Sequence, residues 1–413
     1  MLRQITIAFV LGGSMCAQTL TALHTTDQQI ATYESALGTQ PKNVRSQLSL
    51  ALAYLQKVRE TADYSYLDRA SALVGKVLAG DSGNNQALRL RNEIGLQKHE
   101  FRDVADSAAD LSKLAPNDAG NWANLGDALM ELGHYDRAGA AYARMIQIRP
   151  GLESYNRAAY HNYVTGNSET AIRLMKIAIA AGSSTPEPIA WCYAELGDMY
   201  FKTGNVGEAL DAYSAAVKLF PSLHRAHAGL GRVFAGQGKG AAAIESYKRA
   251  QAAVPLPEYA AALEKLYSRG GNAVEARKQR ALIDVMDRLA SSRGEKANRV
   301  LALIYLDEGR NIERAAQLAE AELDNRGDVY TYDALGWVYF KQNRIAEAES
   351  MSARAVKLKT PEPSFYYHAG MIAAAAGRVE DARNLLTRAL DLNAQFDSDA
   401  AAAARKTIAS LPN

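Results

Sequence analysis

Residues 121–150, NWANLGDALMELGHYDRAGAAYARMIQIRP, carry Trp, His, Tyr, Asp, Glu and Arg side chains at a density that could indicate an active site. Their spacing points to packing instead. Trp122, Leu125 and Leu129 fall at helical intervals and form one apolar stripe. The first half of the segment is therefore predicted to be an amphipathic helix.

Small residues and a proline divide this segment into two helices. Gly126 lies beside the apolar stripe and allows a partner helix to approach closely, and Gly133 stands where a left-handed cap ends the first helix. Ala138 is small where the second helix crosses the first, and Pro150 cannot continue that helix. Each residue thus has a packing or surface role, so the segment predicts a helical hairpin and no catalytic site.

The hairpin recurs along the chain with a period of 34 residues. Several residue types return together at this interval, which makes coincidence a poor explanation. The matching positions are Pro116 and Pro150, Pro221 and Pro255, Gly197 and Gly231, Gly336 and Gly370, Tyr213 and Tyr247, Ala209 and Ala243, and Ala348 and Ala382. A fixed period of this length indicates a stacked array, in which each unit buries its apolar face on its neighbours.

The recurring pattern resembles the tetratricopeptide repeat, whose hallmark is Trp-x2-Leu-Gly-x2-Tyr, then Ala-x3-Phe or Tyr, then Pro. The resemblance covers nearly the whole chain after its first residues. It implies an all-α, right-handed superhelical solenoid of about ten stacked helix-turn-helix units. The clear copies, followed by the weaker ones, are at 119–152, 190–223, 224–257, 329–362 and 363–396, and at 85–118, 152–185, 257–295 and 296–328.

The repeats suggest a division of the chain into six parts. Two breaks in the 34-residue register support this division. One is an insertion within 181–188, which is expected to form a longer loop. The other follows Ala276, where the second helix of the unit is expected to run past its usual end. The parts are 1–17, a signal peptide; 27–84, degenerate N-terminal repeats; 85–257, a first repeat block; 258–295, an irregular repeat with a long helix; 296–396, a second repeat block; and 397–413, a C-terminal cap helix.

The overall charge excludes partners that are recruited by strong electrostatic fields. The 413 residues carry a formal net charge of +2, and no block of like charges is present. A chain with this charge balance has no single-sign field that would attract nucleic acid or an anionic membrane. We therefore expect no nucleic-acid partner.

The first residues differ from the repeats in composition. One basic residue, Arg3, precedes a short apolar run and then small residues, an order that is typical of a secretory signal peptide. The run is too short to span a membrane. We therefore expect an exported protein, periplasmic in a bacterium, without a transmembrane span. A lipid anchor at Cys16 is the less favoured alternative, because Gly13 and Met15 stand where bacterial lipoprotein signals carry Leu and a small residue.

No arrangement of side chains in the sequence points to catalysis. Only His224 and His227 share a helix face, and no carboxylate at helical spacing completes a metal site. Two cysteines, Cys16 and Cys192, are too few for a disulfide framework or a thiolate zinc site. No serine stands in a strained-turn motif of the nucleophile type. We expect a non-enzymatic protein without a metal or cofactor.

The resemblance implies that proteins or peptides bind in a concave groove lined by the first helix of each unit. Residues that follow the Trp or Tyr of a unit by one position, or by about one further turn, are predicted to point into it. For Tyr160 and Trp337, packing between adjacent helices is the alternative. The predicted groove residues are Asp127, Asn156, Tyr160, Tyr163, Asp198, Phe201, Lys202, Arg232, Asp333, Trp337, Phe340, Lys341 and Tyr367. Aromatic side chains mixed with both charges suit contact with another protein.

One binding mode of the family is not expected here. Some members clamp a terminal carboxylate with Lys, Asn and Arg on three successive first helices, whereas the matching positions hold Ala123, Asp127, Arg157, Trp191 and Glu195. The function implied is an exported scaffold that binds partner proteins or peptides, in envelope assembly or secretion. The alternatives are an accessory or ligand-binding subunit of an enzyme complex, for instance one that handles polysaccharide, and a cytoplasmic scaffold.

Overall fold

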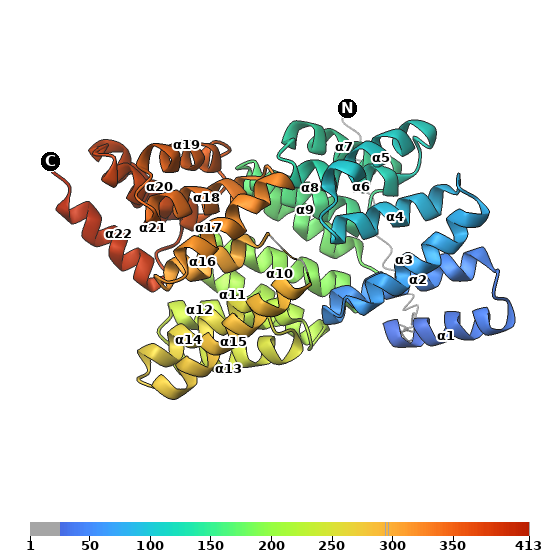
Figure 1. The fold of residues 1–413 in the computed structure, drawn as a ribbon, viewed down its shortest axis with the longest axis horizontal. Helices are drawn as coiled ribbons and strands as arrows, with labels where there is room; N and C mark the ends of the chain where they lie inside the picture. The colour runs from blue at the N-terminus through green and yellow to red at the C-terminus, as the bar shows by residue number, and fades with distance from the viewer. Residues whose placement is uncertain (1–24, 294, 296, 413) are drawn as a thin grey trace, which may run out of the picture.

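The computed structural model describes residues 25–293, 295 and 297–412, and every regular element in this part of the chain is a helix (Figure 1). Ten consecutive helix pairs, from α2 with α3 to α20 with α21, are flanked by the single helices α1 and α22. The predicted all-α solenoid of about ten units is confirmed. The signal peptide predicted at 1–17, and Cys16 with it, lies outside the described residues.

The helices of the first five pairs, with α1 before them, have the following bounds: α1 Thr26–Thr39, α2 Val44–Thr61, α3 Ser65–Gly80, α4 Asn85–Gln97, α5 Phe101–Leu114, α6 Ala119–Glu131, α7 Tyr135–Ile148, α8 Leu152–Val164, α9 Ser168–Ala181, α10 Pro186–Lys202 and α11 Val206–Leu219. The last five pairs and the final helix are α12 His224–Gly236, α13 Gly240–Ala253, α14 Pro257–Arg269, α15 Ala273–Ser292, α16 Arg299–Asp307, α17 Ile312–Glu320, α18 Val329–Lys341, α19 Ile345–Val356, α20 Pro363–Ala375, α21 Val379–Asn393 and α22 Ser398–Ser410. A short 3-10 helix, Ala321–Asp324, follows α17.

Local sequence sets where the helices of a pair begin. The Asp118 side chain accepts a hydrogen bond from the Gly120 N–H at 2.9 Å, and Asp328 accepts one from the Thr331 N–H at 2.7 Å. Such caps satisfy backbone donors that have no partner inside the helix. The second helix follows a tight turn through a left-handed residue, as at Gly133 with a φ of 76°. Glycine adopts this conformation without the strain that a Cβ atom would cause.

A glycine and a tyrosine pack against each other inside the best-formed units. A Cβ atom at Gly126 would lie 2.3 Å from the Tyr142 ring, and one at Gly197 would lie 2.6 Å from the Tyr213 ring. The predicted close approach at Gly126 is therefore real, and the tyrosine ring of the second helix fills the space. Tyr213 is fully buried, and Gly229 of the next unit also lies against its ring.

Replacing Gly197 by Ala is expected to lower the free energy of unfolding by about 1–3 kcal/mol, as for other overpacked cores. The Tyr213 ring cannot move aside, since a Cβ at Gly229 would already lie 2.2 Å from it. Gly336 is the matched control, because its unit has no such tyrosine and its nearest contact is the Ser352 nitrogen at 3.3 Å. We expect Gly336→Ala to change stability by less than about 1 kcal/mol, since alanine also favours the helix. Equal losses in urea unfolding would contradict the packing argument.

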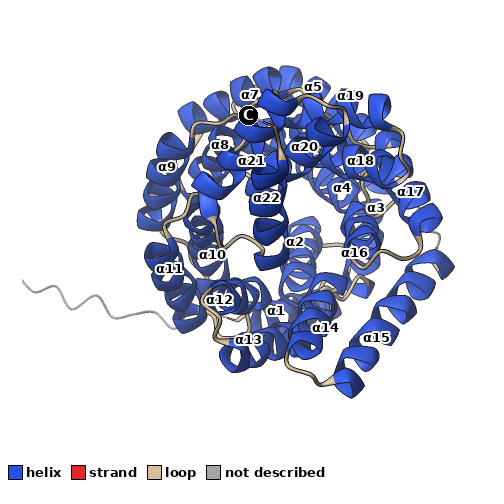
Figure 2. Cartoon of the chain, turned by 90° about the vertical axis from the view of Figure 1, so that its left-hand side faces the viewer, coloured by secondary structure: helices blue, strands red, loops and turns tan. Residues whose placement is uncertain are grey.

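The helix pairs wind into a superhelix whose second turn lies directly on its first. Figure 2 shows the helices arranged in a ring, and Figure 1 shows the orange and red second-turn helices beside the blue and green first-turn helices. The α6–α7 pair contacts the start of α18, the α8–α9 pair contacts the segment before α20, and α10 contacts the end of α21 just before α22. Units that touch in this way are six apart along the chain, so each superhelical turn holds six units.

We call this line of contact the seam. It joins the turns inside the α6–α7, α8–α9 and α10–α11 hairpins to the segments around the starts of α18, α20 and α22, and its hydrogen-bonded partners are 192 to 198 residues apart. The backbone carbonyls of Glu131, Val164 and Phe201 accept hydrogen bonds across it from the Gly327 N–H at 3.0 Å, the Thr360 hydroxyl at 2.5 Å and the Asn393 side-chain amide at 2.7 Å.

Glycines let the two turns come this close. The turn glycines Gly271 and Gly377 also have a positive φ, but a Cβ atom there would meet nothing within 4 Å. The seam differs from these open turns. Cβ atoms built at Gly133, Gly166 and Gly204 would lie 2.1, 2.6 and 2.6 Å from the carbonyl oxygens of Gly327, Leu358 and Leu392. At the seam, glycine is needed both for the backbone angle and for the approach of a second backbone.

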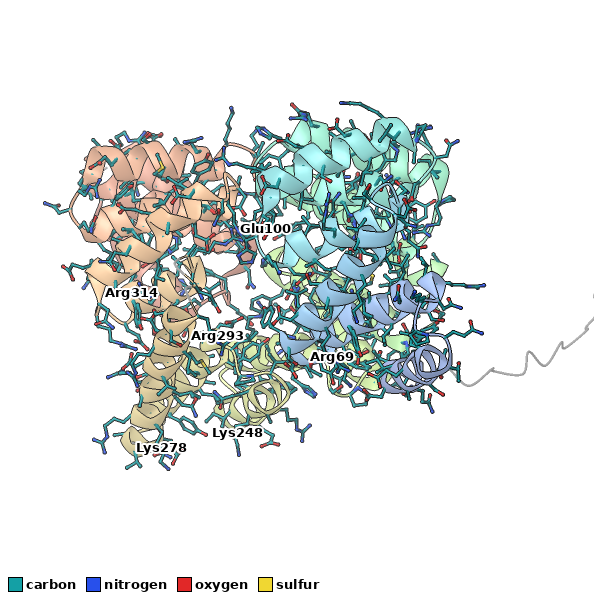
Figure 3. The ribbon with its side chains drawn as sticks, turned by 45° about the vertical axis from the view of Figure 1, so that its right-hand side comes forward. Arg69, Glu100, Lys248, Lys278, Arg293 and Arg314 are labelled. Atoms are coloured by element: carbon teal, nitrogen blue, oxygen red, sulfur yellow. The ribbon has the colours of Figure 1, made fainter. Side chains whose placement is uncertain are left out.

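Apolar and charged contacts complete the seam. Val329 and Phe365 of the second turn are buried in the same hydrophobic cluster as Tyr163 of the first. The Arg326 guanidinium of the second turn lies 2.8 Å from the Glu131 carboxylate of the first. Figure 3 shows the blue and cyan first-turn helices facing the orange second-turn helices across this line. The seam is therefore a continuous interface within one chain.

The two breaks in the repeat register appear as longer helices. The first helix α10 has 17 residues, against 13 in α6 and α8, and the second helix α15 has 20, against 14 in α11 and α13. The insertion within 181–188 therefore extends α10 instead of forming only the predicted longer loop. The physical reason is Pro186, whose fixed φ suits the first turn of a helix. The extra helical turn carries Glu187 toward α2.

Candidate partner-binding chamber

The concave face of the first superhelical turn encloses a cavity of about 1010 Å³, which we call the chamber. Its walls are mainly the first helices α2, α4, α6, α8 and α10, together with residues of α1 and α12. The second turn contributes Arg299 at the start of α16 and Tyr330 of α18. The chamber is thus a groove that the winding of the chain has partly closed.

A contact between opposite walls narrows the chamber. The Gln56 side-chain amide of α2 donates a hydrogen bond to the Glu187 carboxylate of α10 at 2.7 Å, although these residues are 131 positions apart. Glu187 is only 3% exposed, and this burial raises the pKa of its carboxyl group. The extra turn of α10 therefore closes one side of the chamber.

Ion pairs between successive first helices line the walls. Arg157 of α8 contacts Asp127 of α6 at 2.9 Å, and Arg225 of α12 contacts Asp198 of α10 at 2.8 Å. Arg232 also pairs with Asp198. Each pair joins one unit to the next, so the charges stabilise the stack and also give the chamber walls both signs of charge.

Tyrosines from the second helices complete these ion pairs. The Tyr142 hydroxyl donates to Asp127 at 2.8 Å, and the Tyr213 hydroxyl donates to Asp198 at 2.6 Å. Burial alone would raise the pKa of Asp198, but Arg232 and Arg225 outweigh it and hold that pKa well below its usual range. The carboxylate therefore stays charged across the physiological pH range.

The thiol on the chamber wall is not a reactive group. Cys192 is 1% exposed, and the Asn156 side-chain amide lies 3.3 Å from its sulfur. Burial raises the pKa of the Cys192 thiol to about 12. Because the thiolate is the nucleophilic form, this cysteine is a packing residue.

The structure brings six of the predicted groove residues together. They are Asp127, Asn156, Tyr160, Tyr163, Asp198 and Lys202, and all six line the chamber. Tyr163 is 3% exposed, and its hydroxyl donates to the Pro361 carbonyl at 2.9 Å, so it serves the seam. Lys202 is also engaged there, with its ammonium 2.5 Å from the Glu362 carboxylate. The other four present polar groups to the chamber from α6, α8 and α10.

The remaining predicted groove residues do not line the chamber. Phe201 is buried in a core cluster with Tyr213, because its side chain points between the helices of its own unit. Arg232 is bound to Asp198. The others belong to the second turn and form a separate group: Asp333, Trp337, Phe340, Lys341 and Tyr367.

This second group is mostly packed rather than open. Trp337 is 3% exposed and stacks on Phe340 and His368, with ring centroids 4.9 and 4.2 Å away. Asp333 is buried against His368, whose ring nitrogen lies 3.0 Å from the carboxylate. Asp333, next to the repeat's aromatic residue, and Trp337, about one turn further, both contact His368 of the adjacent first helix, so neither is available to a partner. Lys341 covers the Trp337 ring at 4.6 Å.

Several chamber residues were missed by the sequence reasoning. Arg89 and Glu93 hold the same repeat positions as Ala123 and Asp127, 34 residues earlier, but their unit has Leu88 in place of the tryptophan. Counting back one 34-residue period from Ala123 and Asp127, without requiring the tryptophan, would have identified both residues. Nothing in the sequence signals Arg299 or Tyr330, because they reach the chamber only through the seam.

The histidines that share a helix face have structural roles. The His224 ring nitrogen lies 2.6 Å from the Tyr259 hydroxyl, and that of His227 lies 2.8 Å from the Pro221 carbonyl. Burial and the nearby Arg225 lower the pKa of His224 to about 4. Within residues 25–293, 295 and 297–412, no three His, Cys, Asp or Glu side chains are grouped so that they could hold a metal ion.

None of the helices in the described part of the chain combines the length and the apolar character that crossing a bilayer requires.

The fold and the chamber define an all-α solenoid of helical hairpins with a concave binding face. Family models described as tetratricopeptide repeat match residues 119–151, 156–223, 194–256 and 334–401. The chain belongs to the tetratricopeptide repeat family, and it is a scaffold of the kind that mediates protein–protein interaction. No curated protein has a significantly similar sequence.

Several solved structures are similar to this chain at low sequence identity. PilW, a type IV pilus biogenesis factor, is 18% identical with a TM-score of 0.43, over 49% of this chain and 93% of its own. A thermophilic tetratricopeptide repeat protein of Thermus thermophilus is 18% identical with a TM-score of 0.39, over 44% of this chain and 94% of its own. A chain of the APC/C hetero-tetramer Cut9–Hcn1 is 16% identical with a TM-score of 0.46, over 93% of this chain and 76% of its own.

Proposed function

We propose that this protein is an exported, non-enzymatic adaptor that binds a segment of a partner protein in the chamber, in envelope assembly or secretion. The observation that carries the proposal is the composition of the chamber wall. Asp127, Arg157, Glu195 and Arg225 alternate in sign along successive first helices, and Trp191 lies under the Arg225 guanidinium at 4.4 Å. Aromatic anchors surrounded by both charges are typical of protein-binding surfaces.

The chamber suits an extended segment better than a folded domain. It is a cavity of about 1010 Å³ narrowed by the Gln56–Glu187 contact, so a folded domain is too large for it. The Asp127, Glu195 and Asp198 carboxylates of the wall are already paired with arginines. A partner with both acidic and basic residues can therefore form new ion pairs with the wall carboxylates and arginines, so that no charge is left unpaired. We expect the affinity to fall with rising salt.

A photo-crosslinking amino acid in the chamber is expected to form adducts with a partner protein in the native host. Leu52 is a suitable site, because it lines the chamber and is 38% exposed, so its replacement disturbs little packing. Leu114 is the matched control, since it is 81% exposed and does not line the chamber. We expect protease-sensitive adducts at Leu52 and none at Leu114. Equal adducts at both sites, or protease-resistant adducts of polysaccharide, would contradict the proposal.

Export is tested on the same purified protein. The sequence favours removal of residues 1–17, and the intact mass after fractionation reports whether this occurs. A shortened mass in the soluble exported fraction supports an exported adaptor. A full-length mass in the cytosol would overturn export and leave the chamber proposal to the crosslinking result.

A further inference from the structure

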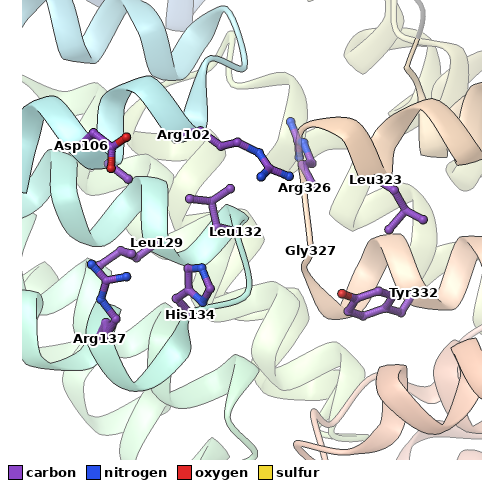
Figure 4. Close-up of a pocket in the computed structure, with 11 residues that line it drawn as sticks. Arg102, Asp106, Leu129, Leu132, His134, Arg137, Leu323, Arg326, Gly327 and Tyr332 are labelled. Carbon is purple, nitrogen blue, oxygen red and sulfur yellow. The ribbon is translucent and has the colours of Figure 1, made fainter.

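A second cavity lies outside the chamber, on the seam. Its volume is about 480 Å³, and we call it the seam pocket. The first turn supplies Arg102 and Asp106 of α5, Leu129 and Leu132 from the end of α6, and His134 and Arg137 around the start of α7. The second turn faces them with Leu323, Arg326, Gly327 and Tyr332 (Figure 4). The seam pocket is therefore complete only when the two superhelical turns are in contact.

The seam pocket has an excess of positive charge. Arg326 is neutralised, because its guanidinium lies 2.8 Å from Glu131 and 3.2 Å from Glu322. Arg102 and Arg137 differ from it, since the side chain of neither forms an ion pair or hydrogen bond within the described part of the chain. Asp106 is the single acidic residue among the lining side chains. Two guanidinium groups thus remain without a carboxylate.

The two free guanidinium groups are separated by an apolar floor. Figure 4 shows Arg102 on one side of Leu132 and Arg137 on the other, with the Arg102 guanidinium directed toward the second turn. Leu323 faces this floor from across the seam and is 37% exposed. A guanidinium binds a carboxylate through two parallel N–H donors, so each arginine can hold one carboxylate. Hydrocarbon between the carboxylates would cover the leucines.

We propose that the seam pocket binds a small organic dicarboxylate, with one carboxylate on Arg102, the other on Arg137 and a short hydrocarbon chain over Leu132. A ligand in this position touches Leu323 and Tyr332 as well, so it is held by both turns. Because the seam pocket exists only in the closed superhelix, binding stabilises the closed form by mass action. The site is distinct from the chamber, and the proposal does not depend on what the chamber binds.

Titration of the full chain with glutarate at low ionic strength, followed by calorimetry, is expected to show one site per chain. Acetate should bind at least tenfold more weakly, because it engages one arginine, and inorganic phosphate should also be weaker, because it covers no apolar surface. Glutarate should raise the melting temperature. Absence of binding, or phosphate binding more tightly than glutarate, would overturn the dicarboxylate assignment.

Substitutions separate a built site from general attraction to a cationic surface. Arg102→Ala and Arg137→Ala should each weaken glutarate binding at least tenfold, whereas Arg173→Ala, an exposed arginine on α9 that does not line the seam pocket, should not change it. Asp106→Asn should tighten binding, because it removes the one acidic group of the lining, and a loss of folding would not produce this gain. Equal weakening by Arg173→Ala, or no response to Asp106→Asn, would refute the site.

Discussion

Replacing Gly133 by Ala is expected to lower the free energy of unfolding by about 2–5 kcal/mol and to open the seam. About 1–2 kcal/mol comes from placing a Cβ atom at a left-handed residue with a φ of 76°. A further 1–3 kcal/mol or so comes from overpacking, because that Cβ would lie 2.1 Å from the Gly327 carbonyl oxygen. The backbone fixes the position of the Cβ atom, and its partner is a backbone oxygen, so no side-chain rotation relieves the contact.

Gly377→Ala is the control for this variant. Gly377 has nearly the same φ of 75°, in the equivalent turn of its unit, but nothing lies within 4 Å of its Cβ position. The free energy of unfolding of the Gly377→Ala variant should fall by only about 1–2 kcal/mol, the cost of the backbone strain. Urea unfolding measures both losses, and small-angle X-ray scattering should show an expanded particle for Gly133→Ala alone. Equal stabilities and equal dimensions would mean that the seam is absent in solution.

Replacing Asp198 by Ala is expected to cost about 3 kcal/mol of stability, because it leaves Arg232 without its carboxylate and Arg225 with only its second partner, Glu195. Arg225 and Arg232 both pair with Asp198, and the Tyr213 hydroxyl donates to it. This expected loss lies at the lower end of the range for breaking a buried ion pair, since the Arg225 and Arg232 side chains remain 29% and 36% exposed. Asp211 on α11 is the control, an aspartate with no ion-pair partner among the described residues.

The same carboxylate makes stability depend on pH. The folded-state pKa of Asp198 is lowered below the ordinary aspartate value of 3.8, so its contribution is complete above that value. It decreases as the pH falls below 3.8 toward the folded-state pKa. The difference in stability between the natural protein and Asp198→Ala should therefore shrink between neutral pH and about pH 3. A difference that stays constant over this range would exclude the charged pair as its source.

The sequence contains most of the information about the repeat itself. Apolar residues at helical spacing, turn glycines such as Gly133 and terminal prolines such as Pro150 specify each hairpin locally, and a fixed period requires the hairpins to stack. Even the irregular units that contain α10 and α15 were visible as breaks in the 34-residue register. What the sequence did not distinguish was a longer loop from a longer helix at α10, because three extra residues fit either one.

The candidate sites were less accessible to sequence reasoning, for a physical reason. Side chains such as Asp127 and Asn156 face the chamber because their own helix and its neighbour orient them, and repeat position alone predicts this. Residues such as Tyr330 and Arg326 reach a site only because small rotations between units add up over six repeats. No single hairpin encodes that sum, so the seam and its pocket could be seen only in the assembled structure.

The seam also changes how the chain loses its structure. In an open solenoid each unit contacts only its neighbours, so the units can unfold one at a time from either end. Here the hydrogen bonds of Val164 and Phe201 join residues 196 and 192 positions away, which ties the middle units to the last ones. Fraying of the C-terminal units therefore uncovers the middle of the chain. Unfolding becomes cooperative across both turns, and folding must wait for the closure of a very long loop.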